Sequence, residues 1–376
     1  MPDVILSILF PWFIITLSAC YFTFFLLISF AFIRERSKPD LKNKTDISVS
    51  VIIAARNEDV TLPQILSDLK QQDYPADRFN IIIADDHSYE RINSLKDISE
   101  LGIKNLTIIE LPASVSGKKA ALRLAAERST SELLIFTDAD CRVGPQWIKS
   151  YTTLYSERHP DLLFGLVDYQ EVNGILQNFF RYEFLSLVIT GAGSALLGTP
   201  TLCNGANMAI SREYYRRVAG EIDTRSPSGD DVFALHQAKK NKRIIQLVTG
   251  KSATVYTRVP AGLWEYFNQR ARWVSKSVYY RDMATVIISL LVIFANIFFI
   301  FSLIALIRNG YSLPCVFSLI SKMIADYTVI IVGLYFFRDL RSVFWLPLFQ
   351  LIYPVYLFIS LFLGLFGIYR WKDRSY

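Results

Sequence analysis

Long apolar stretches at the two ends of the chain constrain its fold more than any other feature. Val4 to Ile33 carries no charged residue, and Ala284 to Ile307 and Tyr311 to Phe337 are also dominated by aliphatic and aromatic side chains. Since a helix crosses a bilayer with about 20 apolar residues, each stretch is long enough to span one. We therefore predict an N-terminal transmembrane anchor at residues 1–34 and a C-terminal transmembrane region of two to three spans at residues 284–376.

Basic residues directly after the first stretch predict its orientation. They are Arg34, Arg36, Lys38, Lys42 and Lys44. Because cytoplasmic flanks of membrane helices carry an excess of Lys and Arg, we expect an integral protein of a bacterial-type plasma (inner) membrane whose polar middle domain is cytoplasmic. The segment Leu17-Ser18-Ala19-Cys20 resembles a lipoprotein cleavage box, but the apolar run continues to Ile33. We therefore interpret the stretch as a retained anchor.

Two features of the C-terminal region allow alternatives. Lys322 and Asp326 lie inside an apolar stretch, where they either pair with each other on a buried helix face or line a path for the acceptor. We favour the ion pair. Val343 to Tyr369 is interrupted by Pro347 and Pro354, so it is either a single span or a re-entrant hairpin that would keep the basic tail in the cytoplasm. We favour the single span.

The middle of the chain, residues 46–257, alternates short apolar runs with segments of helical spacing. The apolar runs are 48–55, 79–84, 106–111 and 133–137, and helical patterns occupy 61–72 and the residues after Gly117. This alternation predicts an α/β fold with a mostly parallel sheet covered by helices on both faces. In such a sheet the ligand binds at the carboxyl ends of the strands.

Acidic clusters follow these predicted strands. Asp85-Asp86 follows the second run and Asp138-Ala139-Asp140 follows the fourth. Carboxylates at such a position can hold a divalent cation against a diphosphate, although Asp85-Asp86 could instead form a turn or cap a helix. A later pair, Asp230-Asp231, opens a helical run, where it can cap the helix or supply a base for a hydroxyl nucleophile.

A segment rich in arginine and aromatic residues, 258–283, contains the sequence Gln269-Arg270-Ala271-Arg272-Trp273. Arginine can hold a leaving phosphate, and tryptophan offers a face on which a sugar ring can stack. The composition also fits an interfacial amphipathic helix that lies on an anionic leaflet. That alternative explains the composition but not the order of the five residues.

The composition excludes several classes of function. With only three histidines, and four cysteines in no C-x-x-C spacing, a histidine-rich or cysteine-rich metal site is not expected. The net charge is +6, but no basic array interleaved with aromatic residues runs through the polar middle, so we expect no nucleic-acid partner. An anionic nucleotide and anionic membrane lipids fit the charge better.

Taken in order, these motifs resemble a membrane-integrated family 2 glycosyltransferase with a GT-A fold. The motifs are D-D-x-S, G-K-x-x-A-L at 117–122, D-x-D, an acidic pair and Q-R-x-R-W, and the branch includes cellulose, chitin and hyaluronan synthases and ceramide glucosyltransferases. The resemblance covers about Val49 to Trp273. It is imperfect, since Ala54 and Ala55 replace a frequent proline, Asp230 a common glutamate and Arg123 a frequent asparagine.

The resemblance implies a donor site for a nucleotide diphosphate sugar, UDP-linked in our expectation. Asp140, and less directly Asp138, would bind Mg²⁺ or Mn²⁺ between the two phosphates. The implied donor-binding residues are Arg56, Asn57, Glu58, Asp85, Asp86, Lys118, Asp138, Gln269, Arg270 and Arg272. Of these, Asp85 and Asp86 correspond to positions that bind the base and ribose, and Lys118 to a lysine near the diphosphate.

The resemblance also implies an acceptor site and a base. Asp231, flanked by Asp230, would deprotonate the acceptor hydroxyl, since a crowded and partly desolvated carboxylate gains proton affinity. Gly205, Asn207 and Trp273 would bind the acceptor. The run Leu176 to Leu197 is too mixed to span a membrane, and we expect it at the membrane surface.

We therefore predict an inverting, metal-dependent hexosyltransferase that uses a nucleotide-sugar donor and a membrane lipid or short glycan as acceptor. A processive synthase that also translocates its polysaccharide is the alternative within the same class. An inactive nucleotide-binding membrane subunit and a nucleotidyltransferase remain as alternatives from other classes. The sequence identifies neither the sugar nor any protein partner.

Overall fold

The computed structural model describes residues 2–36, 46–220, 229–310, 312–367, 370–371 and 374–375. The chain divides into two compact units. The helical unit consists of Met1–Arg34, Asn173–Thr201 and Pro260–Tyr376, and the α/β unit consists of Glu35–Val172 and Leu202–Val259. The predicted continuous domain at 46–257 is therefore interrupted, because residues 173–201 cluster with the helical unit, as does most of the segment 258–283.

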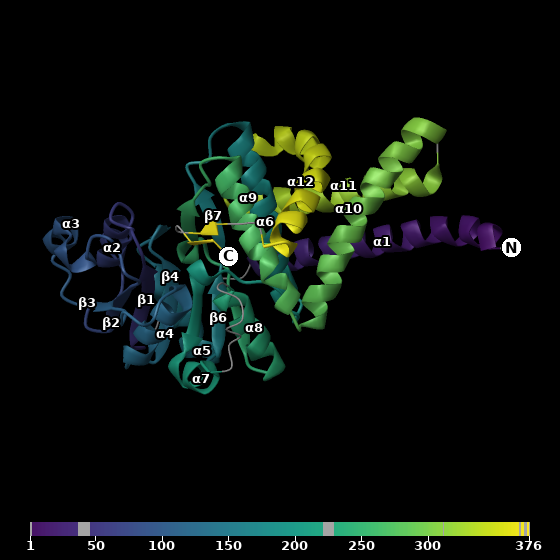
Figure 1. The fold of residues 1–376 in the computed structure, drawn as a ribbon. Helices are drawn as coiled ribbons and strands as arrows, with labels where there is room; N and C mark the ends of the chain where they lie inside the picture. The colour runs from purple at the N-terminus through teal and green to yellow at the C-terminus, as the bar shows by residue number, and fades with distance from the viewer. Residues whose placement is uncertain are drawn as a thin grey trace. The chain divides into compact units, whose positions relative to one another are not determined.

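The described strands of the α/β unit form a seven-stranded sheet in the order β3-β2-β1-β4-β8-β6-β9 (Figure 1). The first four of these strands are parallel, and β8 is antiparallel to both β4 and β6. The mostly parallel, GT-A-like α/β fold expected from the sequence is confirmed. The strands are β1 (Val49–Ala55), β2 (Phe79–Asp85), β3 (Leu106–Glu110), β4 (Leu133–Asp138), β6 (Leu162–Gly165), β8 (Met208–Ser211) and β9 (Ile245–Val248).

The sheet is apolar along its central strands because helices cover it. Val51, Ile52 and Ile53 of β1 are fully buried, and α2 buries Leu62, Ile65, Leu66 and Leu69, which share one face of the helix. The helices of this unit are α2 (Leu62–Lys70), α3 (Lys96–Glu100), α4 (Lys118–Arg128), α5 (Trp147–Arg158), α7 (Arg212–Val218) and α8 (Asp230–Lys240), with short 3₁₀ turns η1 (Ile92–Ser94), η2 (Gly205–Asn207) and η3 (Lys251–Ala253).

A smaller sheet of the order β5-β10-β7 adjoins the D-x-D motif in the sequence. Its strands are β5 (Cys141–Val143), β7 (Val167–Gln170) and β10 (Val255–Arg258). Asp68 of α2 holds β5 in place, accepting two hydrogen bonds from the Arg142 guanidinium at 2.6 and 2.7 Å and one from the Val143 N–H at 3.1 Å. The turn between Asp138 and Cys141 therefore joins the two sheets.

The helical unit contains α1 and five further helices. They are α1 (Pro2–Arg36), α6 (Gly174–Leu196), α9 (Leu263–Ser275), α10 (Met283–Asn309), α11 (Leu313–Phe336) and α12 (Leu346–Leu365), with η4 (Ser277–Tyr279), η5 (Arg341–Trp345) and the strands β11 (Arg370–Trp371) and β12 (Arg374–Ser375). Among the described residues, four segments are long and apolar enough to cross a membrane: Phe10–Glu35, Met283–Arg308, Leu313–Phe336 and Arg341–Leu365. Helix α12 continues through Pro354, so this region is one helix and not a hairpin.

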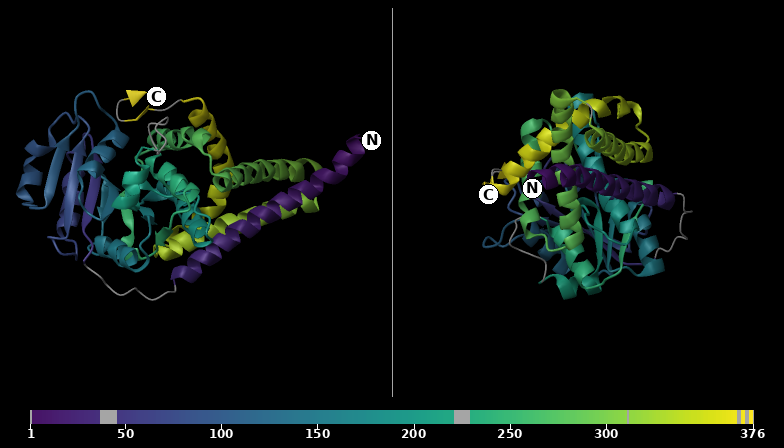
Figure 2. Two further views of the ribbon diagram at one scale, coloured as in Figure 1. Left: turned by 90° about the horizontal axis from the view of Figure 1, so that it is seen from below. Right: turned by 90° about the vertical axis from the view of Figure 1, so that its right-hand side faces the viewer.

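Helix α1 runs alongside the pair α10 and α11 (Figure 2). Phe10 meets Phe301 of α10 edge to face at 5.3 Å. The Tyr21 hydroxyl donates a hydrogen bond to Asp326 of α11 at 2.5 Å, and the Lys322 ammonium lies 2.5 Å from the same carboxylate. The predicted ion pair between Lys322 and Asp326 on a buried helix face is thus confirmed.

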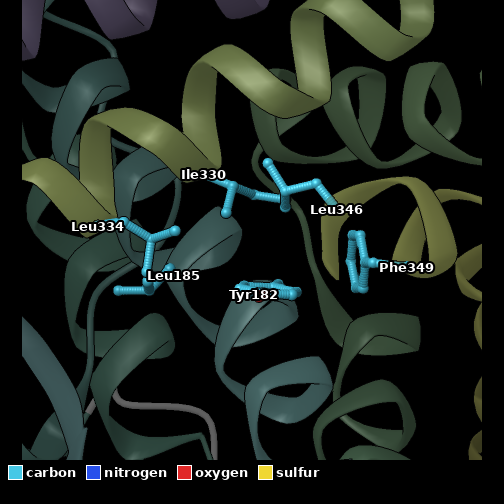
Figure 3. Packing of buried hydrophobic residues seen from close by; sticks show 6 residues of the cluster. All are labelled: Tyr182, Leu185, Ile330, Leu334, Leu346 and Phe349. Atoms are coloured by element: carbon cyan, nitrogen blue, oxygen red, sulfur yellow. The ribbon is translucent and has the colours of Figure 1, made fainter. Parts of the chain in front are cut away.

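Helix α6 packs against α11 and the start of α12. Tyr182 and Leu185 of α6 point toward the same small core as Ile330 and Leu334 of α11 and Leu346 and Phe349 of α12 (Figure 3). Arg181 of α6 is buried and paired with Asp339. The mixed character of α6 therefore reflects a helix packed within the helical unit, where its charges have partners.

Two glycines allow helices of this unit to approach closely. A Cβ added to Gly364 of α12 would lie 2.5 Å from the Cβ of Val274 in α9, and a Cβ added to Gly193 of α6 would lie 2.6 Å from that of Ile28 in α1. Contacts under 3 Å are not tolerated between carbon atoms, so these backbones can meet only at a glycine.

We expect Gly364→Val to separate α9 from α12 and to lower the midpoint of thermal unfolding of the detergent-solubilised protein by several degrees, since overpacking costs about 1–3 kcal/mol. Gly262→Ala is the matched control, because a Cβ at Gly262 meets nothing within 4 Å. Equal unfolding temperatures for the two variants would contradict the close approach.

Candidate functional site

The candidate site begins at the carboxyl edge of the large sheet. Asp85 ends β2 and is paired in register with Ala55, while Asp138 ends β4 and is paired with Ala54. The two aspartates therefore flank the end of β1, roughly 10 Å apart in the plane of the sheet, given a strand spacing of about 4.8 Å. The edge predicted to bind the ligand thus carries the predicted carboxylates.

Asp86 fixes the start of α4. Its side chain is buried and accepts a hydrogen bond from the Gly117 N–H at 3.0 Å, and its carbonyl accepts one from Arg56 at 2.8 Å. Gly117 has a positive φ of 106°, which glycine adopts without strain, and it precedes Lys118, the first residue of the helix. Arg56 and Asp86 thus lie together, as expected, and Asp86 helps to position the loop before Lys118.

Asp85 and Asn57 build the neighbouring turn. Asp85 accepts hydrogen bonds from the N–H and the hydroxyl of Ser88 at 3.0 and 2.7 Å, and the N–H of Asn57 donates to the same hydroxyl at 3.0 Å. Here the structure realises the turn chemistry that the sequence left as an alternative for Asp85. Beside this turn lies a hollow of about 250 Å³, whose lining includes Asn57, Glu58, Ser88 and Tyr89.

The D-x-D turn carries the candidate metal ligands. Asp138 is partly exposed and its carboxylate lies 2.5 Å from the ammonium of Lys118, and Asp140 is also partly exposed. Between them Ala139 is buried, and after them Cys141 is buried, which fixes the turn at both sides. Two accessible carboxylates suit a hard cation that takes its remaining oxygen ligands from a diphosphate and water.

A metal ion held only by protein side chains would need a larger group of ligands than these two carboxylates. Among the described residues, no group of three or more His, Cys, Asp or Glu side chains is placed to hold an ion. Two carboxylates fall within the number found in magnesium sites that substrate phosphates and water complete.

The acidic pair occupies the first turn of α8. Gly229, with a φ of 90°, is the N-cap, so Asp230 and Asp231 are the first helical residues and neither of them is the cap. Asp231 accepts hydrogen bonds from the Gly205 N–H at 3.1 Å and the Val232 N–H at 2.7 Å. Gly205 of η2 and Asp231, assigned to acceptor and base from the sequence, are therefore neighbours.

Burial raises the pKa of Asp230, and the nearby carboxylates of Asp231 and Asp138 raise it further, while the positive charge of Lys118 opposes them. Asp138 is the last residue of β4, and Lys118 is the first residue of α4. The acidic pair and the candidate metal ligands thus belong to one electrostatic environment within the α/β unit.

Asn207 has a different place from the one expected. Its side chain is fully buried, and its amide bonds Trp147, Tyr151 and the carbonyls of Leu166 and Ala253. These protein contacts occupy the amide, so its side chain is not presented to an acceptor. These contacts were not predicted, because the partners lie more than forty residues from Asn207 in the sequence and no local pattern marks Trp147 or Tyr151 as a partner of an amide.

The Q-R-x-R-W motif lies on α9 in the helical unit. Arg270 is buried and forms an ion pair with the buried Glu183 of α6, with the guanidinium Nε 2.7 Å from the carboxylate. Its guanidinium also lies over the rings of Trp273 and Tyr266, at 4.0 and 4.6 Å from their centroids. Arg270 therefore joins α9 to α6, while Gln269, Arg272 and Trp273 are partly exposed. Glu183, a charge inside an apolar run, was the sequence signal for this partner.

Comparisons with known proteins find similarity to glycosyltransferases. Residues 50–218 match the model of glycosyl transferase family 2. The chain is 28% identical over 126 residues to glycosyltransferase AglE of Haloferax volcanii, covering 34% of this chain and 41% of that protein. It is 30% identical over 175 residues to the 4,4'-diaponeurosporenoate glycosyltransferase of Staphylococcus haemolyticus, covering 45% of this chain and 44% of that protein. The match thus spans less than half the length of these curated relatives.

The fold extends the likeness over the whole chain. The mannosyltransferase PcManGT of Pyrobaculum calidifontis, solved in complex with GDP-Man and Mn²⁺, superposes with a TM-score of 0.57 and 18% identity, covering 95% of this chain and 99% of that one. Residues 50–218 are therefore similar to family 2 glycosyltransferases, and the chain has a GT-A-like fold. Among its described residues it also has four helices that are long and apolar enough to cross a membrane.

The raised pKa of Asp230 predicts a pH-dependent stability. A carboxyl group whose pKa is raised by folding stabilises the protein below its ordinary pKa of about 4, and this contribution is lost as the pH rises through the folded value. We expect Asp230→Asn to raise the unfolding temperature of the metal-free protein near neutral pH and to match the wild type near pH 4. Glu127→Gln, on the exposed face of α4, is the control and should change neither value.

Proposed function

We propose that the protein is an inverting, metal-dependent glycosyltransferase that moves a hexose from a nucleotide diphosphate sugar to an acceptor in the membrane. The observation that carries this proposal is the grouping of Lys118, Asp138, Asp230 and Asp231 within one unit, at the carboxyl edge of the sheet. In this proposal the Lys118 ammonium binds the diphosphate, Asp138 is a ligand for a metal ion, and the Asp231 carboxylate accepts the proton of the acceptor hydroxyl.

The donor occupies the edge formed by β1, β2 and β4 in this proposal. The hollow lined by Asn57, Glu58 and Ser88 offers space for part of the nucleotide. Lys118 opens α4, where its ammonium and the helix N-terminus both favour the negative charge of a diphosphate. Its ion pair with Asp138 is exchanged for the phosphates when the donor binds.

In this proposal Asp138 and Asp140 would hold Mg²⁺ or Mn²⁺, which would supply positive charge to offset the negative charge of the departing nucleoside diphosphate. Asp231 takes the proton of the acceptor hydroxyl as the oxygen attacks the anomeric carbon and the bond to the diphosphate breaks. One displacement inverts the anomeric configuration. Its hydrogen bonds from Gly205 and Val232 keep the carboxylate oriented. Arg272 and Trp273 are assigned to diphosphate and acceptor from the order of the motif alone.

A lipid or short glycan is the acceptor that we favour. Four apolar helices place an enzyme where membrane lipids are abundant, and a translocation channel for a polymer is harder to build from so few spans. The relative from Staphylococcus haemolyticus acts, by its name, on 4,4'-diaponeurosporenoate. Mass spectrometry of the product separates single transfer, with one sugar per acceptor, from the processive alternative, with a ladder of lengths.

The donor itself is tested by incubating the purified full chain with Mn²⁺ or Mg²⁺ and a panel of nucleotide sugars, with and without membrane lipids. We expect release of a nucleoside diphosphate with one donor, UDP-linked in the first instance, and faster release with lipid present. Release of pyrophosphate would identify a nucleotidyltransferase. No release with any donor would support the inactive subunit and overturn the proposal.

Asp231→Asn should lower kcat by about 100- to 10,000-fold while the affinity for the donor changes by less than about threefold, because general-base catalysis contributes about 10²–10⁴-fold. The variant removes the charge and keeps the shape, but its amide retains only one of the two oxygens that accept from the Gly205 and Val232 N–H groups. Isothermal titration of donor binding and a coupled assay of nucleoside diphosphate release measure the two quantities. Turnover within tenfold of the wild type would remove Asp231 from the role of base.

Removal of divalent cations with EDTA should abolish sugar transfer, and Mn²⁺ or Mg²⁺ should restore it. Asp140→Asn should raise the concentration of Mn²⁺ needed for half-maximal activity by at least tenfold, since it removes one of the two proposed protein ligands. Asp161→Asn, on an exposed turn before β6, is the control. Full activity in EDTA would contradict the metal-dependent mechanism.

A further inference from the structure

The amide of Asn207 joins four segments of the α/β unit. Its Nδ2 group donates to the carbonyls of Leu166 and Ala253 at 2.7 and 2.8 Å. Its Oδ1 atom accepts from the Trp147 indole at 2.9 Å and from the Tyr151 hydroxyl at 2.7 Å. Both donors and both acceptor positions of the side chain are therefore used, in a site with no exposure to solvent.

The partners of this amide come from separate elements that pack closely around it. Trp147 and Tyr151 lie on consecutive turns of α5, Leu166 lies between β6 and β7, and Ala253 is the last residue of η3. Gly165 has no room for a side chain, because a Cβ there would lie 2.4 Å from the Asn207 amide nitrogen. The Tyr151 hydroxyl also donates to the Asn207 carbonyl at 2.9 Å, so backbone and side chain are held together.

Asn207 is the last residue of the turn that contacts Asp231. This turn, η2, spans Gly205 to Asn207, and the Asn204 side chain caps it by accepting from the Ala206 N–H at 3.0 Å. The N–H of Gly205 donates to the Asp231 carboxylate at 3.1 Å. Gly205 is also close to that carboxylate sterically, since an added Cβ would lie 3.3 Å from the Asp231 Cβ.

We infer that Asn207 is a positioning residue for Asp231: its buried amide fixes the turn whose Gly205 N–H holds the carboxylate in place. This inference rests on the proposed role of Asp231 as the base. It replaces the acceptor contact that the sequence suggested for Asn207 with an indirect role. A buried amide with every hydrogen bond made is rigid, and a turn anchored by it can hold a partner within tenths of an ångström.

Loss of the hydrogen bonds of the Asn207 amide should lower the catalytic rate. A misplacement of about 1 Å of a group that must meet the reacting atom can lower the rate on the order of 100-fold. The donor-binding edge at β1, β2 and β4 makes no use of the Asn207 amide, so donor binding should survive. A split between kcat and KM therefore distinguishes positioning from general damage to the fold.

The test compares Asn207→Asp with Asn80→Ala in the purified full chain. Asn207→Asp keeps the shape of the side chain and the acceptor for Trp147 and Tyr151, but it turns an oxygen toward the carbonyls of Leu166 and Ala253. We expect kcat to fall at least tenfold while KM for the donor stays within about threefold. Asn80→Ala removes the acceptor of the buried Ser50 hydroxyl at the amino ends of β1 and β2, and it should lower stability without lowering kcat.

Gly205→Ala is the second variant, and it keeps the test decisive if Asn207→Asp folds poorly. Gly205 is partly exposed and its added methyl group would press on Asp231 without touching the buried amide. It should lower kcat at least threefold, with an unchanged unfolding temperature. Each variant is then combined with Asp231→Asn. If Asn207 and Gly205 act through Asp231, the second substitution should not lower the residual rate further.

The outcomes separate this inference from the proposed function. If the wild-type protein releases no nucleoside diphosphate from any donor, the proposed function fails. If the wild type turns over but Asn207→Asp and Gly205→Ala both keep kcat within twofold, the positioning role is wrong. The role is also wrong if Asn207→Asp lowers the residual rate of Asp231→Asn by its full factor, because its effect would then not pass through the carboxylate.

Discussion

Mutual repulsion between carboxylates is the constraint around which the α/β unit is organised. Burial and the nearby carboxylates of Asp231 and Asp138 all raise the pKa of Asp230, so a charge on Asp230 is costly. The fold offsets this cost with groups that are fixed by other requirements. Lys118 pairs with Asp138, and backbone N–H groups of Gly205 and Val232 meet Asp231. Carboxylates stabilised in this way can bind a cation or accept a proton. The proposed transfer of a sugar to a hydroxyl group needs both.

The parts of this architecture that follow from local rules were predictable. Strands predicted from continuous apolar runs, such as Val49–Ala55, lie where expected. Asp85 and Asp138 are the last residues of β2 and β4, at the carboxyl edge of the parallel strands, where ligands bind in such sheets. Gly117 and Gly229, directly before α4 and α8, have positive φ values, which glycine adopts without strain. Periodicity and turn chemistry are properties of neighbouring residues, so one sequence suffices to read them.

The parts that depend on distant partners were not predictable. Arg270 was assigned to a diphosphate because of its motif, but Glu183, nearly ninety residues earlier, pairs with it. Asn207 was assigned to the acceptor because of its neighbours, but residues of α5 and two loops surround it. In both cases the side chain's hydrogen-bonding capacity was visible in the sequence and its partners were not. A buried polar group is satisfied by whatever the fold places beside it.

The insertion of α6 between β7 and β8 has a consequence for how the protein is made. Strand β8 lies inside the large sheet, between β4 and β6, and it is synthesised after α6. Until it emerges from the ribosome, β4 and β6 each lack the neighbour that covers an edge, and open edges invite pairing with other chains. The chain therefore makes the whole of α6 before the sheet can be completed. A version freed of its long apolar helices by cutting the two ends alone would still contain α6, and it would expose the face of α6 that packs against α11 and α12.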